Sequence, residues 1–149
     1  MYKKEILSNG LKIICQRMSE KQSVALGIWI KVGGRYESIQ LKGISHFLEH
    51  LLFKGTKKYS CRKLKESIEG VGGSLNGFTA EELTCYYVKI PSRYLEVALD
   101  ILSDMVIQPS LPAQEMEKER TVIIEEIKFI VFITSLWWWI RYKMSQLII

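Results

Sequence analysis

The order of strand-like and helix-like segments restricts the fold of this 149-residue chain more than any other feature. Five runs have the β-branched, aromatic or alternating character of strands: residues 2–7, 11–16, 23–32, 74–79 and 83–90. Four runs have the apolar spacing of helices: residues 43–53, 60–68, 93–107 and those from 113 onward. The two kinds do not alternate strictly, as a parallel doubly wound sheet requires. We therefore expect an α+β fold with an antiparallel-rich sheet and helices packed on one side.

Turn residues and apolar residues refine this expectation. Asn9-Gly10 supplies the positive φ angles of a tight hairpin turn between the first two strands. The run at 23–32, SVALGIWIKV, should be a largely buried strand. Ser92 should cap the third helix. The apolar stripe of that helix consists of Leu95, Ala98, Leu99, Leu102, Met105 and Val106.

Charge and cysteine content exclude several classes of protein. The formal net charge of +5 comes from Lys and Arg residues scattered among Glu and Asp, so no nucleic-acid partner is expected. Cys15, Cys61 and Cys85 are odd in number and lack a Cys-x-x-Cys pair, which predicts buried free thiols in a reducing compartment. The amino terminus has no apolar core long enough for a secretory signal, so a cytoplasmic location is expected.

Residues 129–149 differ in character from the rest of the chain. The uncharged stretch at 129–140, FIVFITSLWWWI, is shorter than the roughly 20 residues that cross a bilayer, and Arg141 and Lys143 follow it. We therefore expect a docked core helix or an interfacial segment, and no membrane span. This reasoning predicts a domain at 1–128 and a divergent hydrophobic tail at 129–149.

Both histidines of the chain lie within KGISHFLEHLLFKGT, residues 42–56. On a helix, His46 and His50 share one face a turn apart, so two imidazole nitrogens can meet one metal ion. Glu49 is offset from that line, in the position of a general base for a metal-activated water. The order His-x-x-Glu-His is the inverzincin pattern of zinc peptidases. Either histidine alone could be a satisfied core residue, but burying all three groups without a metal is costly.

A catalytic zinc ion takes three protein ligands, so the third must come from another segment. The candidates are Glu119, Glu125 and Glu126 of the helix that begins at residue 113. Glu119 and Glu126 are seven residues apart and project from the same face, whereas Glu125 points about 100° away from Glu126. One of the stacked pair could bind the metal while the other orients a histidine ligand. A solvated acidic helix is the alternative.

Four segments together resemble the pitrilysin, insulinase and mitochondrial processing peptidase family of zinc metallopeptidases. They are GISHFLEHLLFKGT, GGSLNGFTAEELTCYY, ALDILSDM and EKERTVIIEE. The resemblance spans residue 1 to about 128 and implies an incomplete amino-terminal domain of such a peptidase, of bacterial type. It implies one Zn2+ per chain held by His46, His50 and Glu126. Glu49 would then be the base, and Glu119 the outer acidic residue that orients a ligand.

The resemblance also implies how a substrate binds. In relatives the segment aligned with SLNGFTA is an edge strand that accepts the substrate as an added strand. Asn76, Gly77 and Phe78 are therefore expected to bind a peptide or an unfolded protein, although a turn and a plain edge strand are the alternative. Relatives commonly carry Ala at the position of Gly77, and glycine would loosen the strand. Because family enzymes close over the substrate, we expect a missing second domain or a partner subunit, which a dimer would also supply.

Three functions remain open at this point. The leading prediction is a zinc-dependent endopeptidase, with the activity of so short a chain in question. The alternative is a non-catalytic peptide-binding or core subunit of a heteromeric processing peptidase, although such relatives usually lose part of the zinc motif. The third is a nonfunctional truncated product with an aggregating tail, because the sequence beyond EEIK departs from the family pattern as a frameshift near Phe129 would make it.

Overall fold

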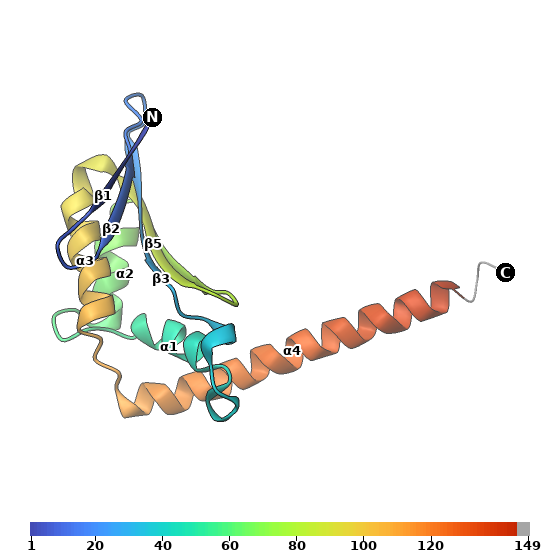
Figure 1. The fold of residues 1–149 in the computed structure, drawn as a ribbon. Helices are drawn as coiled ribbons and strands as arrows, with labels where there is room; N and C mark the ends of the chain where they lie inside the picture. Colours follow the sequence, from blue (N-terminus) through green and yellow to red (C-terminus); the bar gives the residue numbers. More distant parts are fainter. Residues whose placement is uncertain (146–149) are drawn as a thin grey trace.

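The computed structural model describes residues 1–145 as a mixture of helices and antiparallel strands (Figure 1). The strands are β1 (Tyr2–Ile6), β2 (Lys12–Gln16), β3 (Ser23–Ile30), β4 (Ser74–Thr79) and β5 (Thr84–Pro91). The helices are α1 (Ile44–Leu52), α2 (Cys61–Glu69), α3 (Leu95–Ile107) and α4 (Ala113–Ser145). Short 3-10 helices lie at η1 (Gly34–Tyr36), η2 (Ile39–Leu41) and η3 (Ser92–Tyr94). The expected α+β class is confirmed.

Three strands form the main sheet in the order β3-β5-β4. The central strand β5 runs antiparallel to both neighbours, with Tyr86 opposite Ile28 of β3 and opposite Gly77 of β4. Within residues 1–145, β3 and β4 each pair with β5 alone, so each keeps one free edge. A free edge exposes backbone N–H and C=O groups that can pair with an added strand.

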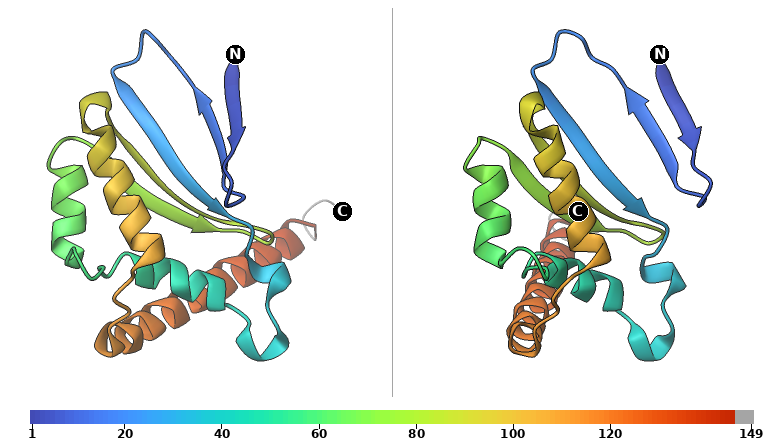
Figure 2. Two further views of the ribbon diagram at one scale, coloured as in Figure 1. Left: turned by 60° about the vertical axis from the view of Figure 1, so that its left-hand side comes forward. Right: turned by 90° about the vertical axis from the view of Figure 1, so that its left-hand side faces the viewer.

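The core lies between this sheet and helices α2 and α3, which cover the same face of it (Figures 1 and 2). Successive side chains of a strand face opposite sides, so Tyr86, Val88 and Ile90 of β5 all point into the core. Helix α1 contributes the buried side chain of Leu52, and α2 and α3 contribute Leu64, Ile68, Ala98, Ile101, Leu102 and Met105. The prediction of helices on one side of the sheet is therefore confirmed.

Two predictions of burial are wrong. β3 alternates between exposed and half-buried residues instead of being largely buried. Only one of its faces packs on the core, and Trp29 on the other face is 64% exposed. In α3, Ile101 is fully buried although the predicted stripe omits it, whereas Leu99 is 44% exposed. Spacing identifies an apolar face of a helix, but the packing of α3 on the sheet decides which of its residues are covered.

The first two strands form a hairpin of their own rather than part of one sheet. Of the two turn residues predicted to have positive φ angles, Gly10 does, at +86°, and Asn9 does not. The backbone N–H of Gly10 donates to the carbonyl oxygen of Leu7, and the Asn9 side chain accepts a hydrogen bond from the backbone N–H of Leu11. Every residue of β1 and β2 is exposed, and the hairpin stands apart from β3 in Figure 2. The expected strands are thus present, but they are divided between two sheets.

A serine side chain caps α2 but not α3. Ser60 accepts a hydrogen bond from the backbone N–H of Lys63 and caps α2. The prediction that Ser92 caps α3 is wrong, because residues 92–94 form η3 and α3 begins only at Leu95. The backbone N–H of Ser92 instead donates to the carbonyl oxygen of Gln22, which ties the end of β5 to the start of β3.

Helix α4 continues without interruption from the acidic segment into the apolar one and extends away from the rest of the molecule (Figures 1 and 2). The large apolar side chains from Phe129 to Ile133, as well as Leu136, Trp137 and Trp139, are exposed. The expectation of a docked core helix is therefore wrong for residues 129–133, 136 and 137, because each of their side chains is at least 43% exposed. Residues 146–149 of the predicted tail lie outside the described part of the chain.

None of the helices within residues 1–145 is both long and apolar enough to cross a membrane.

The three cysteines are free, as expected, but only Cys85 is buried, whereas Cys15 on β2 is exposed and Cys61 is half-buried. The prediction of buried thiols is thus wrong for Cys15. The exposed hairpin that carries it packs on no core within the described residues.

Candidate metal centre

Helix α1 brings the two histidines together. Its nine residues carry His46 and His50 four positions apart, which places their rings on one helix face. The Nε2 atoms of the two rings are 3.1 Å apart, and the rings meet edge to face with centroids 4.7 Å apart. Both side chains are partly exposed, His46 at 39% and His50 at 20%, so an ion could reach them from solvent.

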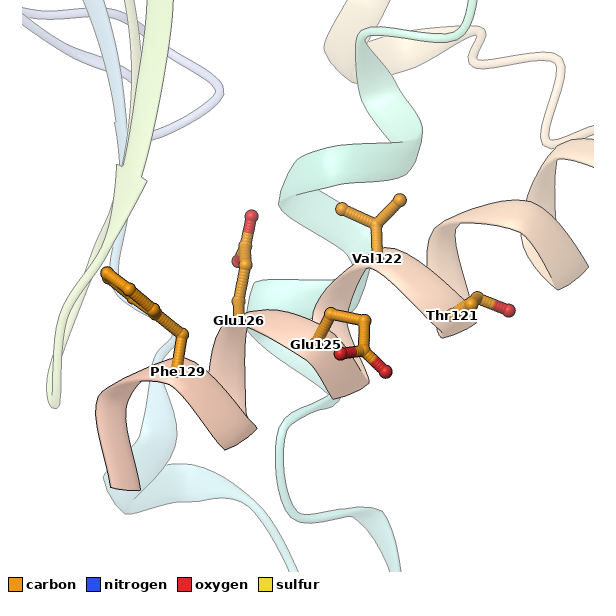
Figure 3. Close-up of a pocket in the computed structure, with 5 residues that line it drawn as sticks. All are labelled: Thr121, Val122, Glu125, Glu126 and Phe129. Carbon is orange, nitrogen blue, oxygen red and sulfur yellow. The ribbon is translucent and has the colours of Figure 1, made fainter. Parts of the chain in front are cut away.

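Helix α4 supplies a carboxylate to the same point. Oε2 of Glu126 lies 3.7 Å from Nε2 of His46 and 3.7 Å from Nε2 of His50. The three ligand atoms lie within 4.8 Å of one another, and this is the one such group of three found among the described residues. Figure 3 shows Glu126 and Val122 leaving α4 on the same side, while Glu125 points elsewhere. Glu125 pairs instead with Lys128, so the predicted divergence of the two neighbouring glutamates is present.

The spacing of these atoms suits a tetrahedral ion. Bonds of about 2.0 to 2.1 Å to a tetrahedral zinc ion place ligand atoms about 3.3 Å apart, close to the 3.1 and 3.7 Å separations here. Two histidines and one carboxylate are also a ligand set of catalytic zinc sites, which leave a fourth position open. The residues therefore fit a zinc ion, although their role as ligands stays a prediction.

Glu119, which projects from the same face of α4 as Glu126, contacts the ring nitrogen of His50 that is farther from Glu126. Its Oε2 is 3.0 Å from Nδ1 of His50. When Nδ1–H donates to this carboxylate, Nε2 of His50 keeps its lone pair and is turned toward Glu126 and His46. The side chain of Glu119 is only 8% exposed, which makes it a buried carboxylate that needs partners.

Lys54 is the second partner of Glu119 and was not foreseen in the sequence. Its ammonium group forms an ion pair with Oε1 of Glu119, while His50 binds the other oxygen. Burial raises the pKa of Glu119, whereas the hydrogen bonds and charges of Lys54 and His50 lower it. The lowering outweighs the raising, so the pKa of Glu119 lies below its usual value. Lys54 stands four residues after His50, the spacing of one helical turn, which is the only signal that could have identified it.

The side chain of Glu49 extends from α1 toward the strand β4. Its Oε2 accepts a hydrogen bond of 3.4 Å from the hydroxyl of Thr79, and a Cβ added to Gly77 would lie 3.1 Å from its Oε1. The burial of Tyr86 and the nearby charge of Glu49 raise the pKa of the tyrosine. The carboxylate predicted to act as a base thus faces the strand predicted to bind substrate.

The three residues predicted to bind substrate do not share one face of β4. Gly77 faces α1, because its nearest neighbours there are Glu49 and Phe53. Phe78 lies on the open face of the sheet, 5.9 Å from the ring of Trp29, and Asn76 is exposed on the same alternate side of the strand. A strand added to the free edge of β4 would therefore present successive side chains alternately to the metal centre and to the aromatic face.

Comparison with known proteins places this arrangement in a family. Residues 12–131 match the family described as Insulinase (Peptidase family M16). Over 128 residues the chain is 43% identical to the uncharacterized zinc protease YmxG of Bacillus subtilis (strain 168), a match that covers 86% of the chain and 31% of the relative. Over 122 residues it is 38% identical to the probable mitochondrial-processing peptidase subunit beta of Arabidopsis thaliana, with 82% and 23% covered.

A solved structure shows the same fold. The crystal structure of a protease from Helicobacter pylori matches with a TM-score of 0.81 and 28% identity over 87% of this chain and 31% of the other. The chain spans about a third or less of the length of these three proteins. The sequence match over most of the chain and the shared fold agree with the resemblance carried by the His-x-x-Glu-His segment, and the chain belongs to the insulinase family of peptidases, family M16.

Proposed function

We propose that this chain carries the zinc site of a metalloendopeptidase, with His46, His50 and Glu126 as ligands of one Zn2+ ion. The observation that supports this most is the convergence of two imidazole nitrogens and one carboxylate oxygen, from two helices far apart in sequence, on one partly exposed point. Bacterial relatives named zinc proteases support the choice of metal. A bound zinc ion supplies Lewis acidity and makes water a nucleophile near neutral pH.

Glu49 is the group of this chain that moves the proton. It sits on the side of α1 that faces β4, where Thr79 donates a hydrogen bond to Oε2 and leaves the other oxygen for a second partner. In the proposed reaction Glu49 takes a proton from the attacking water and returns it to the leaving amine of the cleaved peptide. Glu119 keeps His50 oriented throughout, because its carboxylate holds Nδ1–H and is itself held by Lys54.

The free edge of β4 is the proposed peptide site. An extended peptide pairs there through its backbone, next to Asn76, Gly77 and Phe78. Gly77 allows the strand to lie close to Glu49, because a Cβ added there would lie 3.1 Å from Oε1 of the carboxylate, closer than an ordinary van der Waals contact. The peptide or unfolded protein substrate is thus placed beside the proposed base, while recognition depends on backbone more than on side chains.

The test separates metal binding from cleavage. The chain should bind one zinc ion per molecule and hydrolyse an unstructured peptide, with hydrolysis lost in chelator and restored by zinc. Glu49→Gln should abolish cleavage and keep the zinc, whereas Glu126→Gln should lose zinc affinity. The matched control is Glu125→Gln on the adjacent position of α4, which points away from the site and should change neither. Equal loss of zinc in Glu49→Gln would overturn the assignment of roles.

A second candidate is a peptide-binding or core subunit that works with another chain. The name of the Arabidopsis relative as a subunit favours it. A parent chain that binds zinc and peptide but cleaves only after a second domain or partner subunit is added, or only as a dimer, would support this candidate.

The proposed site of action is the bacterial cytoplasm, because its reducing conditions keep cysteines such as the three of this chain as free thiols.

A further inference from the structure

The metal-binding helix α1 begins without a cap of its own. Gly43 at its start has a φ of +90° and no side chain, and the first turn contains no acidic residue. The first N–H groups of any helix lack partners within the helix and must be satisfied from outside. His46 is the third residue of α1, so it lies in the turn that frays first when those groups are unsatisfied.

Glu37 provides the missing partner from a loop upstream. Its Oε2 accepts a hydrogen bond of 2.7 Å from the backbone N–H of Gly43, and its Oε1 accepts one of 2.8 Å from that of Ser45. Both oxygens are thus used on the start of one helix. A negative charge in this place also interacts favourably with the helix dipole. In agreement, the hydrogen bonds from Ser45 and Gly43 lower the pKa of Glu37.

The loop that carries Glu37 is itself attached to the turn between β4 and β5. The backbone N–H groups of Gly34 and Arg35 donate to the carbonyl oxygens of Ala80 and Glu81. The approach depends on Gly33, where an added Cβ would lie 2.1 Å from the Ala80 carbonyl oxygen. Lys42 closes the loop at its other end by donating to the carbonyl oxygen of Gly34. The position of Glu37 is therefore set by contacts outside α1.

We propose that Glu37 is a positioning residue of the metal centre, which holds the first turn of α1 in place and thereby keeps His46 aligned with His50 and Glu126. This inference rests on the proposed zinc site. Each proposed functional residue of α1 then has its own positioning partner. Glu37 binds the first turn, which carries His46; Glu119 binds His50; and Thr79 donates a hydrogen bond to Glu49. Loss of Glu37 should therefore misplace one ligand while the others stay held.

Three variants of the full chain test this role. Glu37→Ala removes both acceptor oxygens, and Glu37→Gln keeps one acceptor in a side chain of the same shape, so it should restore part of the function. Ser60→Ala is the matched control, because it removes the cap of α2, a helix of equal length that carries no metal ligand. Two readouts are compared: amide hydrogen exchange in the metal-free chain, and zinc affinity measured against a competing chelator.

We expect each variant to affect amide exchange in its own helix, and only the Glu37 variants to affect zinc affinity. Glu37→Ala should speed exchange at Gly43 and Ser45 and raise the Kd for zinc about tenfold or more, with Glu37→Gln in between. Ser60→Ala should speed exchange at Lys63 and leave the Kd unchanged, even where it lowers the midpoint of thermal unfolding. Should Glu37→Ala not fold, the same-shaped Glu37→Gln carries the comparison.

The two proposals can fail separately. A parent chain that binds zinc while Glu37→Ala and Glu37→Gln bind it with the same Kd overturns the positioning role and leaves the zinc site standing. An equal loss of affinity in Ser60→Ala overturns it as well, because the effect would then follow general stability. A parent chain that binds no zinc overturns the proposed function, and the inference with it.

Discussion

Replacement of Glu119 separates two effects that the structure assigns to its two oxygens. Oε1 pairs with Lys54 and Oε2 lies 3.0 Å from Nδ1 of His50, with the glutamate side chain 8% and the lysine side chain 24% exposed. An ion pair that is this well shielded from solvent adds more to the free energy of unfolding than a surface pair does. Hydrogen bonds to charged groups add about 1.5 to 3 kcal/mol each. We therefore expect Glu119→Ala to lower the free energy of unfolding by about 2 kcal/mol in the metal-free chain.

The zinc affinity should fall for a different reason. Without the carboxylate, Nδ1–H of His50 has no acceptor to fix the ring, and the loss of such a partner typically costs 10- to 100-fold in metal affinity, or about 1.4 to 2.7 kcal/mol. Glu119→Gln should recover most of the affinity, because the amide oxygen can still accept from His50. It should not recover the stability, since the amide nitrogen then faces the ammonium group of Lys54.

Urea unfolding of the metal-free variants and zinc titration against a chelator measure the two effects independently. Glu117→Gln on the same helix is the control, because the Glu117 side chain is 79% exposed and should change neither quantity. A folded Glu119→Ala variant with the zinc affinity of the parent would refute the reasoning, since His50 would then be oriented without Glu119.

Three further predictions concern the fold around the site. The folded pKa of Glu37 lies below its ordinary value of 4.5, so its contribution to stability is present above that pH and is lost as the pH falls through the lower, folded pKa. Acid titration of unfolding should therefore show a shallower loss of stability below about pH 4.5 in Glu37→Gln than in the parent. Ile101→Ala, in the middle of the core, should lower the free energy of unfolding by about 2 to 5 kcal/mol, as measured by urea denaturation; a loss below 1 kcal/mol would contradict its full burial. Gly33→Ala should destabilise by about 1 to 3 kcal/mol, because the new Cβ meets the Ala80 carbonyl oxygen at 2.1 Å; thermal unfolding at the parental midpoint would contradict that contact.

The elements of the fold could be predicted because their signals are local. Gly10 supplies the positive φ of the first hairpin turn, and the spacing of apolar residues identified α1, α2 and the body of α3 within a few positions. The burial of β3 and the start of α3 could not be predicted in the same way. The burial of β3 depends on which of its faces the rest of the molecule covers, and the start of α3 depends on η3 and on the hydrogen bond from Ser92 to Gln22. Spacing along the chain contains neither piece of information.

The same division holds at the candidate metal centre. His46, Glu49 and His50 lie within one helix, so their relative directions follow from helical geometry alone, and the sequence by itself determined them. Periodicity also paired Glu119 with Glu126, but it left open which of them meets the histidines and which orients one of them. The packing of α1 on α4 decided that: Glu126 reaches both Nε2 atoms, and Glu119 reaches Nδ1 of His50.

Lys54 and Glu37 lay beyond prediction for the same reason. The four-residue spacing of Lys54 from His50 does not reveal its partner Glu119, which lies 65 positions later. Glu37 has no spacing that links it to α1, because its loop is held by the turn after β4. A short helix specifies the directions of its own side chains through hydrogen bonds between neighbours in sequence. What meets those side chains is determined by contacts between distant segments, and these form only when the whole core packs.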